Sequence, residues 1–354
     1  MKKAVIAMSG GVDSSVAAFL TKDMGFECIG ATMKLFENSD IGRSREKSCC
    51  SLEDVEDARS VAESLGMKYY VFNFADSFRE AVIDRFVKDY ENGRTPNPCI
   101  DCNRHLKFDK LFRRAEEIGF DYVVTGHYAR IEKCGERYLL KKAVDSTKDQ
   151  SYVLYSMTQH QLAHTLFPLG GMCKTEAREI AEKHGFINAK KRDSQDICFV
   201  QNGRYTDFIK QYTGKDYPEG DFKDIHGNVI GRHKGIIYYT VGQHKGLGIS
   251  SDVPLYVREV CPKDNSIVLC ESDGLFSKTL CAKDINLISA DSIEKPIRVS
   301  AKVRYRQQEQ PATVVQTGED TIRVDFDEPQ RAVTKGQAVV LYDGDTVVGG
   351  GTIF

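Results

Sequence analysis

The chain has 354 residues, of which 41% are hydrophobic, and its formal net charge at pH 7 is −2. A chain of this length can bury a large core divided over two or three domains, and its near-neutral charge excludes a protein that attracts nucleic acid through a strong overall positive field. No apolar run is long enough to cross a bilayer and the N-terminus lacks the pattern of a secretory signal, so we expect a cytoplasmic protein with no membrane partner. The odd number of cysteines, eleven, predicts reduced thiols.

The first part of the chain alternates short apolar runs with helical patterns. The predicted strands are residues 3–8, 27–33, 68–74 and 121–126. The predicted helices are residues 12–24, 51–65, 77–92 and 103–118. Strands that alternate with helices in this way predict βαβ units, and therefore a mostly parallel sheet covered on both faces.

The second part of the chain has a different pattern. Helices are predicted over 174–185 and 205–212, and beyond about residue 218 short alternating segments lie between glycine-rich turns, which is typical of an all-β region with a break near 284–296. We therefore predict three domains: an α/β domain over 1–204, a small central α+β or β domain over 205–285, and a C-terminal β-barrel over 286–354.

The stretch AVIAMSGGVDSS, residues 4–15, places a glycine-rich turn between a predicted strand and a predicted helix. Gly10 and Gly11 let the backbone approach a ligand closely, and the free N–H groups of a helix N-terminus attract an anion. Asp13 repels a phosphate unless a Mg²⁺ ion bridges the two, and a helix-capping role is the alternative. The stretch matches neither the Walker motif nor the dinucleotide-binding fingerprint, so it predicts another kind of phosphate site.

Residues 94–108, RTPNPCIDCNRHLKF, place Cys99 and Cys102 at C-x-x-C spacing after two prolines that predict an extended loop. We expect Cys102 near the N-terminus of a helix with basic residues close by, and both features favour the thiolate. A zinc half-site or a pair of buried thiols is the alternative, although a structural zinc ion needs two further ligands. Cys198, in KKRDSQDICFV, is by itself compatible with a core position.

The string SGGVDSS resembles the pyrophosphatase loop (PP-loop) of a superfamily of enzymes that cleave ATP to AMP and pyrophosphate. The whole chain resembles the tRNA-specific 2-thiouridylase family of the MnmA type. The motifs that carry this resemblance follow one another in the family's order: SGGVDSS, GRTPNPC, TGHYAR, KDQSYVLY, LFPLG, DSQDICF, YTVGQHKGLGI, KVRYRQ and FDEPQRAVTKGQAVVLYDG. The resemblance implies an ATP-binding α/β domain, a small central domain and a C-terminal β-barrel.

The resemblance also implies a reaction, the sulfuration of C2 of the wobble uridine in the tRNAs for Lys, Glu and Gln. ATP, with Mg²⁺, would adenylate the uracil C2 oxygen, and a persulfide sulfur would then attack C2 and release AMP. Cys198 would carry the persulfide, relayed from an upstream donor protein, and free sulfide is the alternative sulfur source. Cys102 would be the catalytic nucleophile that frees this sulfur or resolves the product as a Cys102–Cys198 disulfide.

Further site residues are implied at positions that match the family's motifs. ATP would be held by Ala7, Met8, Ser9, Gly10, Gly11, Val12, Asp13, Ser14, Met33 and Gly126. The target base, flipped out so that its edge can react, would contact Asn97, Pro98 and Cys99. The rest of the tRNA would contact Lys148, Asp149, Gln150, Arg304 and Tyr305.

Several alternatives stay open in the sequence. Some members of the family have Asp where this chain has Cys99, so Cys99, Cys102 and Cys198 are candidate ligands of a 4Fe–4S cluster whose free iron would carry a sulfide. Another PP-loop adenylating enzyme is an alternative that the C-terminal motifs argue against. A non-catalytic tRNA-binding protein is a further alternative, and the intact loop and cysteines argue against it.

Overall fold

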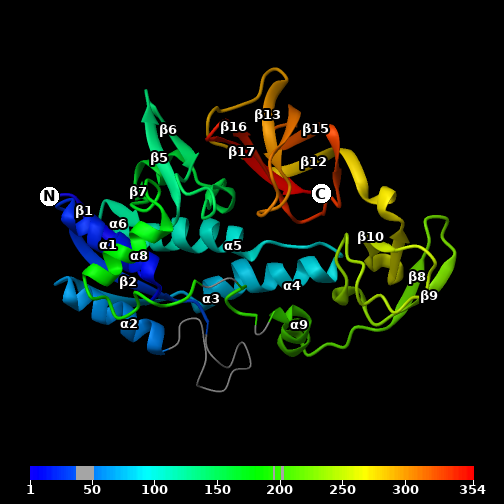
Figure 1. The fold of residues 1–354 in the computed structure, drawn as a ribbon, viewed down its shortest axis with the longest axis horizontal. Coiled ribbons are helices and arrows are strands. Elements are labelled where there is room, and N and C mark those ends of the chain that lie inside the picture. The colour runs from blue at the N-terminus through cyan, green and yellow to red at the C-terminus, as the bar shows by residue number, and fades with distance from the viewer. Residues whose placement is uncertain (37–51, 194–195, 201–202) are drawn as a thin grey trace. The chain divides into compact units, whose positions relative to one another are not determined.

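The computed structural model describes residues 1–36, 52–193, 196–200 and 203–354 (Figure 1). These residues form two compact units. The first unit comprises Met1–Val82, Cys99–Gly203 and Asp345–Val347. The second unit comprises Ile83–Pro98, Arg204–Gly344 and Val348–Phe354. Neither unit is therefore one continuous stretch of the chain.

A parallel sheet forms the centre of the first unit. Its strands follow the order β3-β2-β1-β4-β7, and neighbouring strands are parallel. The strands are β1 (Lys3–Ala7), β2 (Glu27–Lys34), β3 (Lys68–Asn73), β4 (Tyr122–Val124) and β7 (Thr165–Leu166). The loop after β1 leaves the carboxyl edge of the sheet, where sheets of this kind bind their ligands.

Helices cover both faces of this sheet because successive side chains of β1 point to opposite sides. Ala4 and Ile6 belong to one apolar cluster with residues of α1, α2 and α8. Val5 belongs to another cluster with residues of α6. These helices are α1 (Val12–Asp23), α2 (Leu52–Ser64), α6 (Leu111–Glu117) and α8 (Lys174–Lys183). The predicted α/β fold of the N-terminal part is confirmed.

One helical stretch begins earlier than the sequence predicted. Its parts are α5 (Pro98–Asp101), a π-helical segment (Cys102–Lys110) and α6, which follow one another without a break. The prediction of an extended loop through Pro98 is wrong because the first turn of a helix has no intrahelical use for the N–H that proline lacks. Cys102 therefore lies one turn inside the helix.

The first unit also contains a hairpin that the sequence analysis missed. β5 (Ala129–Cys134) and β6 (Arg137–Lys142) pair in antiparallel fashion around a turn at Gly135. Their charged, partly exposed side chains do not form the apolar run that marks a buried strand. The short helices of this unit are α3 (Ala75–Phe78), a 3₁₀ turn (Ser151–Leu154) and α7 (Gln159–Ala163).

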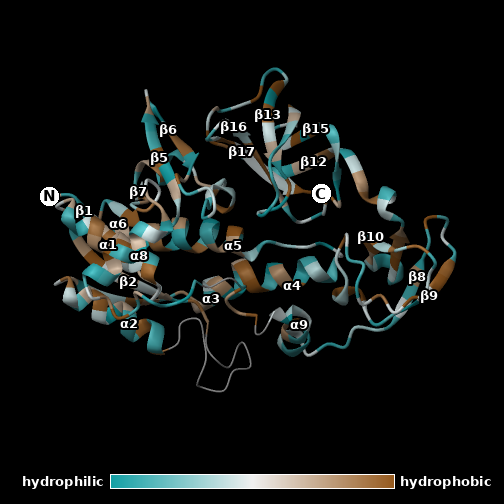
Figure 2. Ribbon diagram, viewed as in Figure 1, coloured by the Kyte–Doolittle hydropathy of each residue, from teal (hydrophilic) through white to brown (hydrophobic). Residues whose placement is uncertain are grey.

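Helix α4 (Asp84–Glu91) lies in the second unit and follows the π-helical segment Arg79–Ile83. Apolar and polar residues alternate along its ribbon in Figure 2, and its apolar side chains Phe86, Val87 and Tyr90 are buried. Helix α9 (Tyr205–Thr213) packs on it through aromatic rings, with the rings of Tyr90 and Tyr205 stacked at 4.4 Å.

The rest of the second unit is mainly β structure, as the sequence predicted, with short 3₁₀ turns at Ile236–Tyr238, Pro262–Asp264 and Ser272–Leu275. A small sheet has the order β10-β11-β8-β9, and a second sheet closes into a barrel through the pairing of β12 with β17. The small sheet comprises β8 (Gly220–Lys223), β9 (Val229–His233), β10 (Tyr256–Cys261) and β11 (Ser266–Cys270). The barrel comprises β12 (Phe276–Leu287), β13 (Ile297–Lys302), β14 (Gln310–Gly318), β15 (Thr321–Arg331), β16 (Ala338–Asp343) and β17 (Thr346–Ile353).

The barrel core consists of inward-facing aliphatic side chains such as Val314, Ile322 and Leu341. The predicted domain boundaries at 204/205 and 285/286 stay predictions, and β12 runs across the second of them as one strand. Among the described residues, no helix combines the length and the apolar character that crossing a membrane requires.

Candidate active site

The glycine-rich loop between β1 and α1 is shaped by its close packing on α2. Gly10 has a positive φ of 75°, and a Cβ added to it would lie 2.8 Å from the Cα of Asp54 and closer still to the Asp54 carbonyl oxygen. Both the backbone conformation and the lack of space require glycine here. Gly11 is the N-cap of α1 and has no side-chain capping bond, so the alternative that Asp13 caps the helix is wrong.

Hydroxyl groups fix the curvature of this loop. The Ser14 Oγ donates to the Gly11 carbonyl at 2.9 Å and accepts from the Ser9 backbone N–H at 3.2 Å. The Ser15 hydroxyl donates to the same carbonyl at 3.2 Å. The loop is therefore preorganised before any ligand binds.

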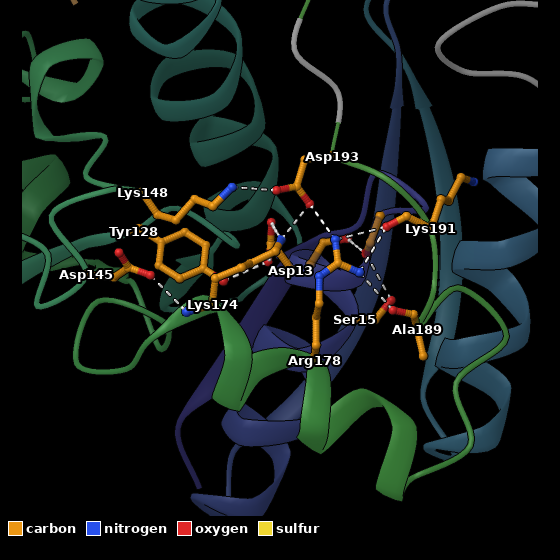
Figure 3. A network of polar contacts seen from close by, with 12 residues as sticks. Asp13, Ser15, Tyr128, Asp145, Lys148, Lys174, Arg178, Ala189, Lys191 and Asp193 are labelled. Atoms are coloured by element: carbon orange, nitrogen blue, oxygen red, sulfur yellow. Dashed lines mark hydrogen bonds and ion pairs between the residues drawn. The ribbon is translucent and has the colours of Figure 1, made fainter. Parts of the chain in front are cut away.

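Asp13 is the first member of a charged network beside the loop (Figure 3). Its two carboxylate oxygens each accept from the Lys174 ammonium at 2.7 Å, and one also accepts from the Tyr128 hydroxyl at 2.8 Å. Burial and the neighbouring Asp13 charge raise the pKa of Tyr128, so its hydroxyl stays a donor. The buried Lys174 ammonium also lies 2.8 Å from Asp193.

The segment that follows α8 also bonds to the glycine-rich loop and to α2. The Asn188 amide donates to the Gly10 carbonyl at 3.0 Å and to the Ser15 hydroxyl at 2.9 Å. The Lys191 ammonium bonds to Asp54 at 2.6 Å and to Asp57 at 2.7 Å, both on α2. Sequence analysis missed these residues and Lys174, because partners 134 to 178 positions apart leave no local pattern.

Two further residues that the resemblance assigned to ATP lie at the same sheet edge. A Cβ added to Gly126 would lie 2.7 Å from the carbonyl carbon of Asp13, so this glycine permits β4 to end against the first turn of α1. Met33, near the carboxyl end of β2, packs partly buried against the cluster that contains Val5. The structure therefore brings the loop and Gly126 together.

His127 follows Gly126, and its ring contacts other side chains of the protein. Its ring is buried, and its Nδ1 lies 2.7 Å from the Thr125 hydroxyl while its Nε2 lies 3.4 Å from the Lys107 ammonium. Burial, and secondarily the Lys107 charge, hold the pKa of His127 well below its usual range. The imidazole is neutral at physiological pH and serves to position Lys107.

The protein surroundings raise the pKa of both cysteines of the C-x-x-C pair. Part of Cys99 reaches the surface, yet the protein atoms packed around its sulfur raise its pKa. Burial raises the pKa of Cys102 to about 11, with Lys107 opposing the shift. The expectation that helix position and basic neighbours favour the Cys102 thiolate is therefore wrong, because desolvation outweighs both effects.

Cys198 lies in the same unit as Cys102 and is half-buried. The next residue, Phe199, is buried and packs edge-on against Phe78 with ring centroids 5.8 Å apart. Among the described parts of the chain, no group of three or more His, Cys, Asp or Glu side chains is arranged to hold a metal ion. The 4Fe–4S alternative with Cys99 as the third ligand therefore finds no support.

The residues expected to contact tRNA have partners within the chain. Lys148 bonds to Asp193 at 2.8 Å, and Asp149 accepts from the Ser151 hydroxyl at 2.7 Å. Gln150 exchanges two hydrogen bonds of 2.9 Å with the backbone of Tyr128. These contacts tie the KDQ motif to the residue that bonds Asp13.

The remaining predicted contact residues belong to the second unit. Asn97 and Pro98 precede Cys99 directly and end one of its chain segments. Arg304 and Tyr305 lie in the turn after β13, where Arg304 donates to the backbone carbonyl of Arg331 and Tyr305 is 40% exposed. An exposed tyrosine in a turn is able to stack on a base.

Comparison with known proteins covers the chain almost from end to end. A family model described as "tRNA methyl transferase HUP domain" matches residues 2–202, one described as "tRNA methyl transferase PRC-barrel domain" matches 206–271, and one described as "Aminomethyltransferase beta-barrel domain" matches 277–353. A protein of Clostridioides difficile (strain 630), "tRNA-specific 2-thiouridylase MnmA", is 54% identical over 99% of this chain and 98% of its own length. The chain belongs to the tRNA-specific 2-thiouridylase (MnmA) family.

Other members of this family are also similar to the chain over nearly its whole length. A protein of the same name from Clostridium botulinum (strain Alaska E43 / Type E3) is 49% identical over 99% of this chain and 98% of its own length. "tRNA-specific 2-thiouridylase MnmA 1" of Thermoanaerobacter sp. (strain X514) is 52% identical over 99% of this chain and 97% of its own length. Because these MnmA relatives match over their whole length, all parts of the chain share the family's organisation.

Proposed function

We propose that this chain catalyses the ATP-dependent 2-thiolation of the wobble uridine in the tRNAs for Lys, Glu and Gln, in the cytoplasm. The observation that carries the proposal is a preorganised PP-loop in the same compact unit as Cys102 and Cys198. The name "tRNA-specific 2-thiouridylase" of relatives that match over their full length supports the substrate.

In the first step the uracil C2 oxygen attacks the α-phosphorus of ATP, and pyrophosphate leaves. The loop residues Ala7 to Ser14, with Met33 and Gly126, would bind the nucleotide, and the backbone N–H groups at the start of α1 would face its phosphates. A Mg²⁺ ion, which usually binds through one or two carboxylates and phosphate oxygens, would use Asp13 and supply charge neutralisation. Asp13 lies in the first turn of α1, and the ion would have to replace the Lys174 ammonium that both of its carboxylate oxygens now bind.

In the second step sulfur replaces the adenylated oxygen at C2. A persulfide on an upstream donor protein would pass its outer sulfur to the Cys198 thiol and leave the donor as a thiol, whereas free sulfide, the alternative source, would attack C2 directly without forming a persulfide. From the Cys198 persulfide, either the outer sulfur attacks C2 and Cys102 then breaks the resulting S–S bond, or Cys102 first attacks Cys198 and the released sulfide attacks C2. Both routes expel AMP and leave a Cys102–Cys198 disulfide, which an external thiol reductant must open.

The tRNA would bring the target base to the start of the α5 helix. Asn97, Pro98 and Cys99 would contact the flipped base, and Lys148, Asp149, Gln150, Arg304 and Tyr305 the surrounding tRNA. Burial raises the pKa of Cys102 to about 11, so a change in its surroundings when substrate binds would favour the reactive thiolate. Near-neutral net charge requires that binding uses local basic side chains and shape.

The test is reconstitution with unmodified tRNA-Glu, ATP, Mg²⁺ and a donor protein that carries a cysteine persulfide, followed by mass spectrometry of the nucleosides. Wild type is expected to form 2-thiouridine, and Cys102→Ser and Cys198→Ser to form none. Exposed Cys281→Ser is the matched control and is expected to retain the activity. Cleavage of ATP to AMP without 2-thiouridine in the wild type would identify a PP-loop enzyme with another acceptor.

A further inference from the structure

Cys99 and Cys102 lie three positions apart on one helical stretch, close enough to form a disulfide. Cys99 belongs to α5, and Cys102 begins the π-helical segment that continues it. Asp101, between them, has φ −62° and ψ −42°, which are the values of an α-helix. Residues three positions apart in such a helix have Cα atoms about 5 Å apart and side chains on one face. A disulfide needs a Cα separation of about 4.4 to 6.8 Å, so the backbone permits this pair to close.

The two thiols differ in their access to solvent. Cys99 is exposed, whereas Cys102 and Cys198 are half-buried. The proposed sulfur transfer ends in a disulfide between the two half-buried residues, and an external thiol reaches such a bond less easily than one that includes an exposed sulfur. Cys99 is therefore placed to connect Cys102 with a reductant in solution.

Lys107 places a positive charge near both members of the pair. Its charge opposes the rise that burial causes in the pKa of Cys99 and of Cys102. The Nε2 of the buried His127 ring lies 3.4 Å from the ammonium. A cation near both sulfurs stabilises the Cys99 thiolate when it attacks a disulfide, and the Cys102 thiolate when it leaves one.

We propose that Cys99 is the resolving cysteine of the catalytic cycle: its thiolate attacks the Cys102 sulfur of the Cys102–Cys198 disulfide, and an external dithiol then reduces the Cys99–Cys102 disulfide that results. The inference rests on the proposed function, which supplies the first disulfide. Because Cys99 also contacts the target base in that proposal, it would attack after the thiolated base has left.

The electrons of both steps balance. In the exchange the Cys99–Cys102 bond forms as the Cys102–Cys198 bond breaks, and Cys198 leaves as a thiolate that takes up a proton. The dithiol then supplies the electrons and protons that restore the thiols of Cys99 and Cys102, and is itself oxidised to a disulfide. Cys198 is thus able to accept a new persulfide sulfur before the pair has been reduced.

Oxidation of the full-length protein by diamide tests whether the pair closes, without tRNA or ATP. The tryptic peptide of residues 95–104 contains both cysteines, so an internal disulfide makes it two hydrogen atoms lighter and protects it from N-ethylmaleimide. We expect this lighter peptide from wild type and from Cys134→Ser, the matched control that removes another exposed thiol of the same unit. Failure of oxidised wild type to join Cys99 and Cys102 would overturn the proposal.

One round of tRNA thiolation by persulfide-loaded protein, without reductant, tests the exchange. For each 2-thiouridine formed, wild type is expected to hold the Cys99–Cys102 disulfide and a Cys198 thiol that N-ethylmaleimide alkylates. Cys99→Ser is expected to hold the Cys102–Cys198 disulfide instead, and added dithiothreitol should reduce it about tenfold more slowly than it reduces wild type.

Two results of this experiment would overturn the proposal: a Cys102–Cys198 disulfide that persists in wild type, or equal rates of reduction in wild type and Cys99→Ser. Absence of 2-thiouridine in wild type would instead contradict the proposed function, and the diamide experiment still decides whether the pair closes. Thermal unfolding curves identify a variant that is merely misfolded, and the wild-type result decides without it.

Discussion

The PP-loop and the cysteine positions lie in one unit, but the fold prepares them in opposite ways. In the loop, the Ser14 hydroxyl already bonds to the Gly11 carbonyl, Asp13 already bonds to Lys174, and Gly10 is held at a positive φ that favours glycine. Around Cys102, burial raises the thiol pKa to about 11 and keeps the sulfur neutral. The loop therefore already has the shape that binds its ligand, whereas the raised pKa of the Cys102 thiol keeps it unreactive.

This difference suits the chemistry that each region would perform. A phosphate site gains from fixed donors because they need not reorganise when charge develops. A permanently exposed thiolate would react with oxidants, whereas a desolvated thiol is inert until its surroundings change. The contrast predicts that variants of the loop destroy binding, while changes around the cysteines alter the timing of reaction.

The largest effect is expected from Gly10→Ala, which breaks the preorganised loop. The new methyl group overlaps the backbone of Asp54, and the positive φ adds strain, for a combined cost of about 4 kcal/mol or roughly a thousandfold in nucleotide affinity. Calorimetric titration with Mg²⁺ and α,β-methylene-ATP, which cannot be cleaved between its α- and β-phosphates, measures it. Gly25→Ala has a similar φ of 84° but meets no atom within 4 Å, so normal affinity there would show that the overlap with Asp54 matters.

Lys174→Met is expected to cost about 3 kcal/mol of the free energy of unfolding. The ammonium is buried, and its loss leaves the carboxylates of Asp13 and Asp193 without their shared cation. Urea denaturation measures this change. The exposed Lys183→Met on the same helix should change stability by less than about 0.5 kcal/mol, and an equal loss in both variants would refute the role of the network.

The pH dependence of Cys102 alkylation sharpens the other side of the comparison. A pKa raised to about 11 means that the thiol form dominates below that pH. The alkylation rate of the folded protein should therefore rise roughly tenfold per pH unit across pH 7 to 10. In urea the rate should level off near the ordinary cysteine pKa of about 8.5. A folded-state rate that levels off below pH 9 would contradict a raised pKa of the Cys102 thiol.

Lys107→Met should have the smallest effect of the four changes. Lys107 is the largest influence that lowers the pKa of Cys102, so its removal should raise that pKa further and slow alkylation at pH 8 by a few fold. Lys110→Met, on the same helix, provides the control. Faster alkylation in Lys107→Met would contradict this prediction, because it would mean that the Lys107 side chain blocks access of the reagent to the Cys102 thiol.

Much of this architecture could be predicted from the sequence because the signals are local. The alternation of apolar runs and helical patterns predicted the parallel sheet, and SGGVDSS marked the loop at the end of β1. The hairpin of β5 and β6 was missed because its side chains are charged and half exposed. The start of the α5 helix was missed because Pro98 was interpreted as a breaker, although the first turn of a helix accepts proline.

The sequence by itself determined the fold class, the position of the glycine-rich loop and the identity of the cysteines, because periodicity and turn chemistry act over neighbouring residues. Only the tertiary structure decided that Lys174, Asn188 and Asp193 gather around the loop, since their bonds join positions far apart in the chain. It also decided the direction in which the pKa of Cys102 shifts. Desolvation depends on every atom packed around the sulfur, and these atoms cannot be read from the charged residues that neighbour Cys102 in the sequence.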